Sequence, residues 1–260
     1  MLAFVIGGRR FWRRLGLGLL ALSLILMLLA PLRASWQYLL TVGHRRIHPI
    51  YAVATQEKKV AFSFDACWGA ERTPAILAAL RQQNVRTTFF LVNIWLRKYP
   101  AEAKQIVAEG HEIGLHSATH PHFTRLRDEE IIWELRENAR LIREVTGFEA
   151  RLFRPPFGDY NDRVISLVQQ QGYIPIQWSV DSLDWKDLTA EAIYKRVRER
   201  IKPGAIVLFH NNGKHTPEAL APLISYLKGQ GYEIVPISAL IYHDHYFIDA
   251  NGIQHPGSPD

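Results

Sequence analysis

Residues Lys59 to Gly69 read KVAFSFDACWG, an apolar run that ends at a carboxylate. The part from Lys59 to Phe64 has the length and the apolar content of a buried strand. Asp65 comes directly after it, followed by Ala66 and by Cys67, the only cysteine of the chain. This strand is the first of several similar units, and their order along the chain decides the predicted fold.

Short apolar runs alternate with helical patterns over most of the chain. The predicted strands are Lys59–Phe64, Thr87–Val92, Glu112–Leu115, Leu152–Phe153, Tyr173–Trp178, Ala205–Phe209 and Glu233–Val235. The predicted helices are Pro74–Gln83, Ala101–Glu109, Asp128–Thr146, Asn161–Gln171, Ala190–Ile201 and Pro217–Gly229. This alternation is typical of parallel strands with helices packed outside them. An α/β fold with a seven-stranded (β/α) barrel, closed or incomplete, is therefore favoured over an open sheet.

Composition and charge limit the classes of partner. The chain has 260 residues and is 48% hydrophobic, which is enough for one sizeable core. Its formal charge is +6, but residues 1–32 contain four arginines and no acidic residue. Without those four the charge falls to +2, so the folded part is nearly neutral and no nucleic-acid partner is expected.

The N-terminal region has the pattern of a membrane anchor. Leu15–Leu32 is an uncharged, mainly apolar run that follows the arginines, and as a helix it spans about 27 Å, close to the thickness of a hydrocarbon core. We expect a single-pass anchor with a cytoplasmic N-terminus and the rest of the chain outside. A cleaved signal peptide is the alternative, but no small residue lies three positions before the cut expected near Ala34.

Four parts are predicted along the chain. They are a basic stub with the anchor (1–34), a juxtamembrane linker (35–56), the (β/α) domain (57–242), and a C-terminal hairpin and tail (243–260). The hairpin is predicted because apolar and polar residues alternate around Asn251-Gly252, a dipeptide that favours tight turns.

Chemically reactive side chains follow the predicted strands at the point where each strand ends. They are Asp65, His116, Arg154, Asp181, Asp184 and His210. In a (β/α) barrel the carboxyl ends of the strands meet at one mouth, where active sites lie. Each residue alone has an ordinary structural explanation, but their shared position predicts one site.

The segment HSATH contains two candidate metal ligands. His116 and His120 are four residues apart, so a helical turn after the strand would bring both imidazoles to one side. Neutral imidazoles suit zinc, cobalt or nickel. The flanking His111 and His122 are interpreted as solvated or capping residues.

The segment RPPFG predicts a rigid turn at the mouth. Its two prolines have no N–H, so Phe157 carries the first free amide after Arg154 and could donate to an oxyanion. Arg154 is suited to hold a carboxylate by a bidentate contact and to keep it ionised.

The segments DSLDW and IVLFH add an acid, a base and an aromatic ring. An acid within reach of His210 would raise the pKa of the imidazole and make it a general acid. Trp185 offers a flat apolar face that suits a sugar ring, although core packing would give the same pattern.

In this order and spacing, SFDACWG, HSATH, RPPFG, DSLDW and IVLFH resemble the motifs of the NodB-like polysaccharide deacetylases, carbohydrate esterase family 4, over residues 57–242. The resemblance implies a distorted (β/α) barrel that uses a divalent metal, usually zinc, to remove acetyl groups from chitin-like or peptidoglycan sugars. It also implies the role of each residue. Asp65 is then the general base, His116 and His120 are metal ligands, His210 is the general acid, Arg154 tethers Asp65, Asp184 orients His210, Trp185 helps to wall the pocket, and the Phe157 amide stabilises the oxyanion.

The chain departs from the family pattern at one position. Two adjacent aspartates usually end the first strand, and the second is a metal ligand, but here Ala66 replaces it. The lost oxygen could be compensated by Asp65 itself with water, by the Cys67 thiolate, or by Glu71. We favour two histidines plus water with Asp65 nearby, because a lone cysteine among apolar neighbours is usually inert packing.

The motif variants also resemble the membrane-anchored, sporulation-type deacetylases of spore-forming Gram-positive bacteria. Two other classes of function stay open. The first is a glycan-binding or structural module of the same fold with little turnover, because of Ala66. The second is an amidohydrolase that acts on small molecules.

Overall fold

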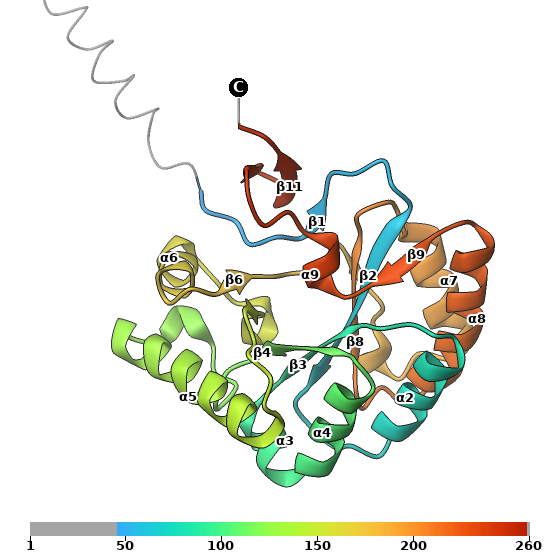
Figure 1. Cartoon of the computed structure of the whole chain (residues 1–260), viewed down its shortest axis with the longest axis horizontal. Coiled ribbons are helices and arrows are strands. Elements are labelled where there is room, and N and C mark those ends of the chain that lie inside the picture. The colour runs from blue at the N-terminus through green and yellow to red at the C-terminus, as the bar shows by residue number, and fades with distance from the viewer. Residues whose placement is uncertain (1–45, 259–260) are drawn as a thin grey trace, which may run out of the picture. The chain divides into compact units, whose positions relative to one another are not determined.

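Parallel pairing around one central strand organises the sheet. The computed structural model describes residues 46–258 (Figure 1). Strand β2 (Lys59–Ala66) lies between β3 (Thr88–Leu91) and β8 (Ile206–His210), and pairs with both in parallel. The predicted strand Lys59–Phe64 is therefore a central strand of the sheet, and Asp65 lies at the carboxyl end of β2.

Eight strands form this sheet, and every pairing in it is parallel. The order is β6-β5-β4-β3-β2-β8-β7, and β9 pairs with the first residues of β2. The remaining bounds are β4 Glu112–Leu115, β5 Leu152–Phe153, β6 Ile174–Pro175, β7 Val180–Asp181 and β9 Glu233–Val235. Strands β6 and β7 end the row without pairing with each other within residues 46–258, so the sheet is a half-barrel and not a closed barrel.

The predicted count of seven strands is wrong because it lacks β7, while the expected strand Tyr173–Trp178 contains β6 alone. Pairing with β5 stops at Pro175, and the backbone of Ile50 takes over the bonding there. The Ile50 N–H donates to the Pro175 carbonyl, and the Gln177 N–H donates to the Ile50 carbonyl. The chain returns to the sheet only at β7, beside β8.

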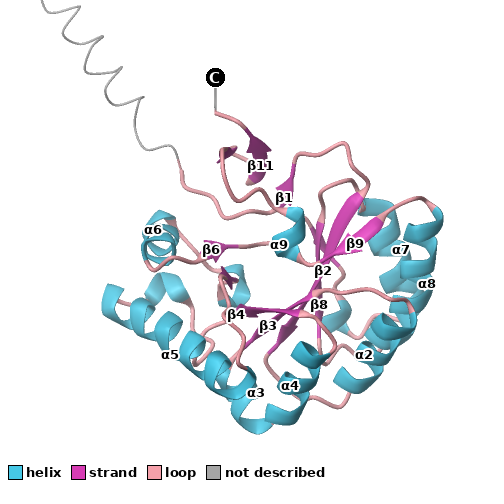
Figure 2. Cartoon of the chain, viewed as in Figure 1, coloured by secondary structure: helices cyan, strands magenta, loops and turns pink. Residues whose placement is uncertain are grey.

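Helices α2 to α8 cover the outer face of the strands (Figure 2). Their bounds are α2 Thr73–Gln82, α3 Asn93–Lys98, α4 Pro100–Ala108, α5 Asp128–Thr146, α6 Asp162–Gln170, α7 Ala190–Arg200 and α8 Thr216–Gly229. The short helix α9 (Ile237–Leu240) packs instead in a second apolar cluster, on the inner face. Alternate residues of β2 belong to the apolar cluster between sheet and helices, namely Val60, Phe62, Phe64 and Ala66. Ser63 and Asp65 lie between them in sequence, so their side chains point to the opposite, inner face.

Helix α5 is the longest element within residues 46–258, and it begins and ends at the predicted residues, Asp128 and Thr146. Its first turn carries Asp128, Glu129 and Glu130, which favour the positive end of the helix dipole. It stops at Gly147, whose φ of 73° is the left-handed conformation common at helix C-termini.

The N-terminal segment and the C-terminal hairpin form a second small sheet. Strand β1 (Ala52–Val53) pairs in parallel with β11 (Ile253–Pro256), which pairs antiparallel with β10 (Tyr246–Ile248). Residues 50–54, which the sequence analysis assigns to a linker, are thus hydrogen bonded into the folded unit. None of the helices described within residues 46–258 has the length and apolar character needed to cross a membrane. The predicted anchor at 15–32 lies outside the described residues.

Candidate active site

A cavity of about 520 Å³ opens at the carboxyl ends of the central strands. Its lining residues are Asp65, Cys67, Trp68, His116, His120, Phe157, Gly158, Trp178, Asp181, Trp185, Leu208, His210 and Asn212. A larger cavity of about 1200 Å³ lies beside the N-terminal segment and the hairpin; it shares Trp178 but none of the reactive groups predicted from the sequence. The smaller cavity is therefore the candidate active site.

Arg154 and Asp65 form a buried ion pair at the base of this cavity. The guanidinium Nη1 donates to Asp65 Oδ1 at 2.8 Å, while Nη2 donates to Ser63 Oγ and to the Gln177 carbonyl. The predicted bidentate contact is thus wrong, because the second nitrogen has other partners. Burial alone would raise the pKa of Asp65, but the charges of Arg154 and of the nearby His116 lower it below its usual value. Asp65 is therefore ionised, with Oδ2 free of Arg154.

His116 is oriented by the backbone of Arg154. Its Nδ1 lies 2.7 Å from the Arg154 carbonyl, so Nδ1 carries the proton and Nε2 keeps its lone pair. This Nε2 lies 3.5 Å from Asp65 Oδ2. Burial lowers the pKa of His116, which favours the neutral ring. A buried, neutral imidazole whose other nitrogen donates to a carbonyl is the usual arrangement of a metal-ligating histidine.

The chain from His116 to His120 is a bend, and the predicted helical turn is wrong. Ser117 and His120 adopt positive φ values of 79° and 60°, and the His120 N–H donates to Ser117 Oγ. The two imidazole centroids are still only 5.1 Å apart. Burial, followed by the charge of His116, lowers the pKa of His120 to about 4. Left-handed backbone at residues other than glycine costs about 1–3 kcal/mol each, and such strain is frequent at functional sites.

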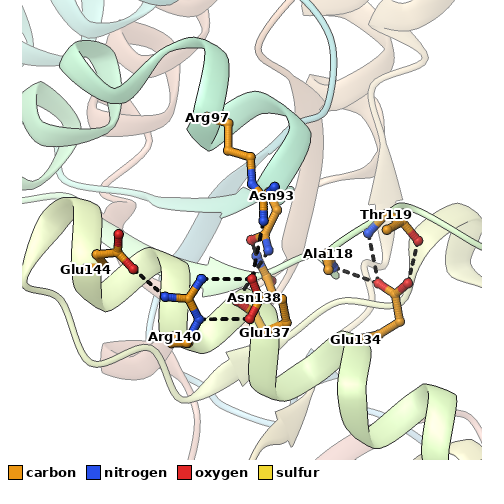
Figure 3. Close-up of polar contacts among 9 residues, drawn as sticks. All are labelled: Asn93, Arg97, Ala118, Thr119, Glu134, Glu137, Asn138, Arg140 and Glu144. Atoms are coloured by element: carbon orange, nitrogen blue, oxygen red, sulfur yellow. Dashed lines mark hydrogen bonds and ion pairs between the residues drawn. The ribbon is translucent and has the colours of Figure 1, made fainter.

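Two polar residues of α5 hold this bend in place (Figure 3). The Glu134 carboxylate accepts the N–H groups of Ala118 and Thr119 at 2.7 and 2.9 Å, and it also accepts the Thr119 hydroxyl. Asn138 accepts the His116 N–H and donates to the Leu91 carbonyl. The His120 N–H, which would close a helical turn, donates to Ser117 Oγ instead, and the positive φ of Ser117 and His120 does not fit a right-handed helix.

The sequence analysis missed both of these α5 residues, although a signal was present. Glu134 and Asn138 are four residues apart within the buried stripe of the helix, which otherwise contains Ile131, Leu135, Leu141 and Ile142. A carboxylate and an amide at core positions of an amphipathic helix need buried partners.

His210 and Asp184 form a second pair at the cavity. Nδ1 of His210 lies 2.8 Å from Asp184 Oδ1, while Asp184 Oδ2 accepts the His210 N–H and the Thr216 hydroxyl. Burial lowers the pKa of His210, but the hydrogen bond and charge of Asp184 outweigh it and raise the pKa above its usual value. The imidazolium is therefore favoured, as the sequence analysis expects.

Three exposed aromatic residues edge the cavity. Trp68, Phe157 and Trp185 are 57%, 62% and 55% exposed and all line it. Phe157 has a φ of 59° within a tight turn closed by the Gly158 and Asp159 N–H groups, and its own N–H takes no part in closing that turn. Its ring stacks on His122.

Three side chains of the cavity could together hold a metal ion. Cys67, His116 and His120 each offer a ligand atom, and these atoms lie within 4.8 Å of one another. Within residues 46–258, neither Asp65 nor Glu71 belongs to this group. Burial and the charge of Asp65 raise the pKa of the Cys67 thiol well above its usual value. Ala66 packs in the apolar cluster between sheet and helices and does not line the cavity.

Comparison with known proteins places the chain in a family. The model of the family described as "Polysaccharide deacetylase" matches residues 52–176. A peptidoglycan-N-acetylglucosamine deacetylase of Bacillus cereus is 34% identical over 200 residues, covering 75% of this chain and 93% of that enzyme. This chain belongs to the polysaccharide deacetylase family. The similar enzyme PgdA of Listeria monocytogenes is 35% identical over 187 residues, 72% of this chain, but the match spans only 40% of that enzyme.

Some of the similar structures are of a family member without activity. BA3943 of Bacillus anthracis is described as a CE4 family pseudoenzyme; its structure has a TM-score of 0.72 and 35% identity, covering 80% of this chain and 72% of that one. A mutant of BA3943 is described as having restored enzymatic activity. The family therefore contains proteins with and without turnover.

Glu134→Gln tests whether α5 positions the histidines. An amide cannot accept all three hydrogen bonds of the carboxylate, so the bend loosens and zinc affinity is expected to fall by about tenfold or more. The measurement is zinc binding in competition with a coloured chelator. The control is Glu137→Gln on the same helix, whose partners Arg97 and Arg140 are surface residues; its affinity should stay within about twofold. Equal affinities for the two variants would contradict the positioning role.

Proposed function

We propose that this chain is a metal-dependent hydrolase that removes acetyl groups from N-acetylated polysaccharide of the cell-wall or chitin-like type. The proposal is carried by two hydrogen-bonded pairs, Asp65 with Arg154 and His210 with Asp184, that open to one cavity. The first pair favours an ionised carboxylate and the second favours a protonated imidazole. Hydrolysis of an acyl group requires a general base and a general acid on the same substrate pocket.

His116 and His120 are the proposed protein ligands of the metal, which is zinc by preference and cobalt or nickel as alternatives. Both imidazoles have a lowered pKa, and the contact of His116 Nδ1 with the Arg154 carbonyl leaves Nε2 with its lone pair. These donors fit a divalent transition metal. When bound, the metal supplies Lewis-acid polarisation of the acetyl carbonyl.

The remaining steps use this chain's own groups. Asp65 Oδ1 is held by Arg154, which leaves Oδ2 to take a proton from the attacking water. The Phe157 N–H donates to the oxyanion of the tetrahedral intermediate. His210 then gives its proton to the leaving sugar nitrogen as the carbon–nitrogen bond breaks. The products are acetate and a free amino group.

The exposed rings of Trp68, Phe157 and Trp185 favour a sugar polymer over a small molecule as substrate. Flat aromatic faces that stay open to solvent suit the apolar faces of successive sugar rings. A small-molecule amidohydrolase would instead be expected to enclose its substrate in a closed pocket.

A second candidate function is a glycan-binding module with little turnover. It is favoured by Ala66, which removes an oxygen ligand, and by the similarity to the BA3943 pseudoenzyme. The two functions differ in acetate release under added metal, while both allow glycan binding.

We also propose that the domain is anchored in the membrane and lies outside the cytoplasm, in the manner of a sporulation-type deacetylase. The support is the arginine-flanked run at residues 15–32. External protease added to intact, wall-free cells should then digest the domain. A domain that stays protected, or that is recovered in the cytosolic fraction, would contradict this location.

Asp65→Asn tests the proposed base while keeping the shape of the side chain. Acetate release from acetylated chitooligosaccharides and peptidoglycan fragments is expected to fall by about 100-fold or more, in protein supplied with zinc or cobalt. The exposed Asp187→Asn serves as the control and should match the unchanged chain. An Asp65→Asn variant as active as the unchanged chain refutes the assigned role. No acetate release by any of these proteins favours the binding module.

Asp184→Asn tests the proposed acid through the pH dependence of activity. His210 acts in its protonated form, so activity is present below its pKa and lost above it. Asp184 raises this pKa, and removing its charge should shift the alkaline limb of the rate profile to lower pH. Asp181→Asn is the matched control, because Asp181 makes the smallest of the contributions that raise the His210 pKa and should shift the limb less in the same direction. An unmoved alkaline limb in Asp184→Asn would rule out His210 as the acid.

A further inference from the structure

The end of β2 determines which side chains enter the cavity. Residues alternate between the two faces of the strand, and Phe64 and Ala66 belong to the apolar cluster under the helices. Asp65 and Cys67 line the cavity. The methyl group of Ala66 therefore packs in the apolar core, while the thiol of Cys67 lies near the two histidines.

Cys67 and His116 are nearly fully buried, so few polar groups can compete for these ligand atoms. His116 Nε2 contacts Asp65 Oδ2 at 3.5 Å, which is longer than a normal hydrogen bond. All three atoms lie within 4.8 Å of one another. In tetrahedral zinc sites, bond lengths of about 2.0–2.3 Å place ligand atoms about 3.3–3.7 Å apart. The distances between the three ligand atoms would therefore need to shorten by about 1 to 1.5 Å at most to hold a zinc ion.

We propose that Cys67 is the third protein ligand of the metal, so that this chain carries a two-histidine, one-thiolate site in place of the carboxylate lost at Ala66. This inference rests on the metal site in the proposed function. On binding, the sulfur–hydrogen bond breaks, the proton goes to solvent and a sulfur–metal bond forms. The thiolate restores the single negative charge that alanine removes.

The thiolate has consequences for the metal and for the chemistry. Soft sulfur donors select zinc and cobalt over magnesium, calcium and manganese. Three protein ligands leave the fourth tetrahedral position open, which is the pattern of catalytic rather than structural zinc sites. The site can thus hold a metal and still admit water or substrate.

Cobalt spectroscopy of the purified full-length chain tests the proposal without an activity assay. Cobalt(II) bound to a thiolate gives a near-ultraviolet charge-transfer band, which imidazole and water ligands do not give. Because Cys67 is the only cysteine of the chain, such a band can only come from it. We expect the band to reach its full height at one equivalent of cobalt, and to disappear in Cys67→Ser.

Affinity and thiol reactivity give two further readouts. Cys67→Ser should bind zinc at least about 10- to 100-fold more weakly, since even outer-shell partners of metal ligands have effects of that size. Zinc should also slow the alkylation of Cys67 in the unchanged chain but not in His120→Ala. Circular dichroism checks that both variants are folded.

The outcomes separate this inference from the proposed function. Cobalt that binds at one equivalent without the charge-transfer band, or equal zinc affinity in Cys67→Ser, overturns the thiolate ligand and leaves the hydrolase proposal intact. A chain that binds neither cobalt nor zinc overturns both.

Discussion

The buried Arg154 is the residue on which the rest of the site depends. Its guanidinium contacts Asp65 and Ser63 on β2. Its carbonyl accepts a hydrogen bond from His116, which follows β4. The ring of Phe90 packs 4.2 Å from the guanidinium carbon, which shields the pair from water. Breaking a buried ion pair by removing one partner costs about 3–5 kcal/mol, because the other charge stays buried. One fully buried arginine therefore favours the ionised form of Asp65, the proposed base, and sets the direction of His116, a proposed metal ligand.

Strand ends could be predicted from the sequence, but the connections between them could not. Buried parallel strands are continuous apolar runs, so Lys59–Phe64 and Ala205–Phe209 are recognised without tertiary information. The break after Pro175 depends on Ile50, more than a hundred residues earlier, which no local pattern reveals. The bend at His116–His120 is likewise predicted wrongly as a helical turn, because the Glu134 carboxylate that holds the bend comes from a different element.

The two hydrogen-bonded pairs follow the family pattern, whereas the proposed metal site departs from it. Asp65 with Arg154 and His210 with Asp184 are both complete in this chain. The metal site departs from the family pattern at Ala66, and sequence reasoning alone treated Cys67 as inert packing. The structure places the thiol in the same cavity as two histidines, which no local sequence pattern reveals. If the sulfur replaces the missing oxygen, the substitution at position 66 changes the preferred metal more than it weakens the site.

The central claim is that Arg154 keeps Asp65 ionised beside His116. The most direct measurement is a carbon-13 NMR titration of the Asp65 carboxyl in the metal-free chain, assigned with Asp65→Asn. The account predicts a pKa below the usual aspartate value, since the arginine outweighs burial. A pKa at or above that value would contradict it, because Asp65 would then lack the charge that a general base needs.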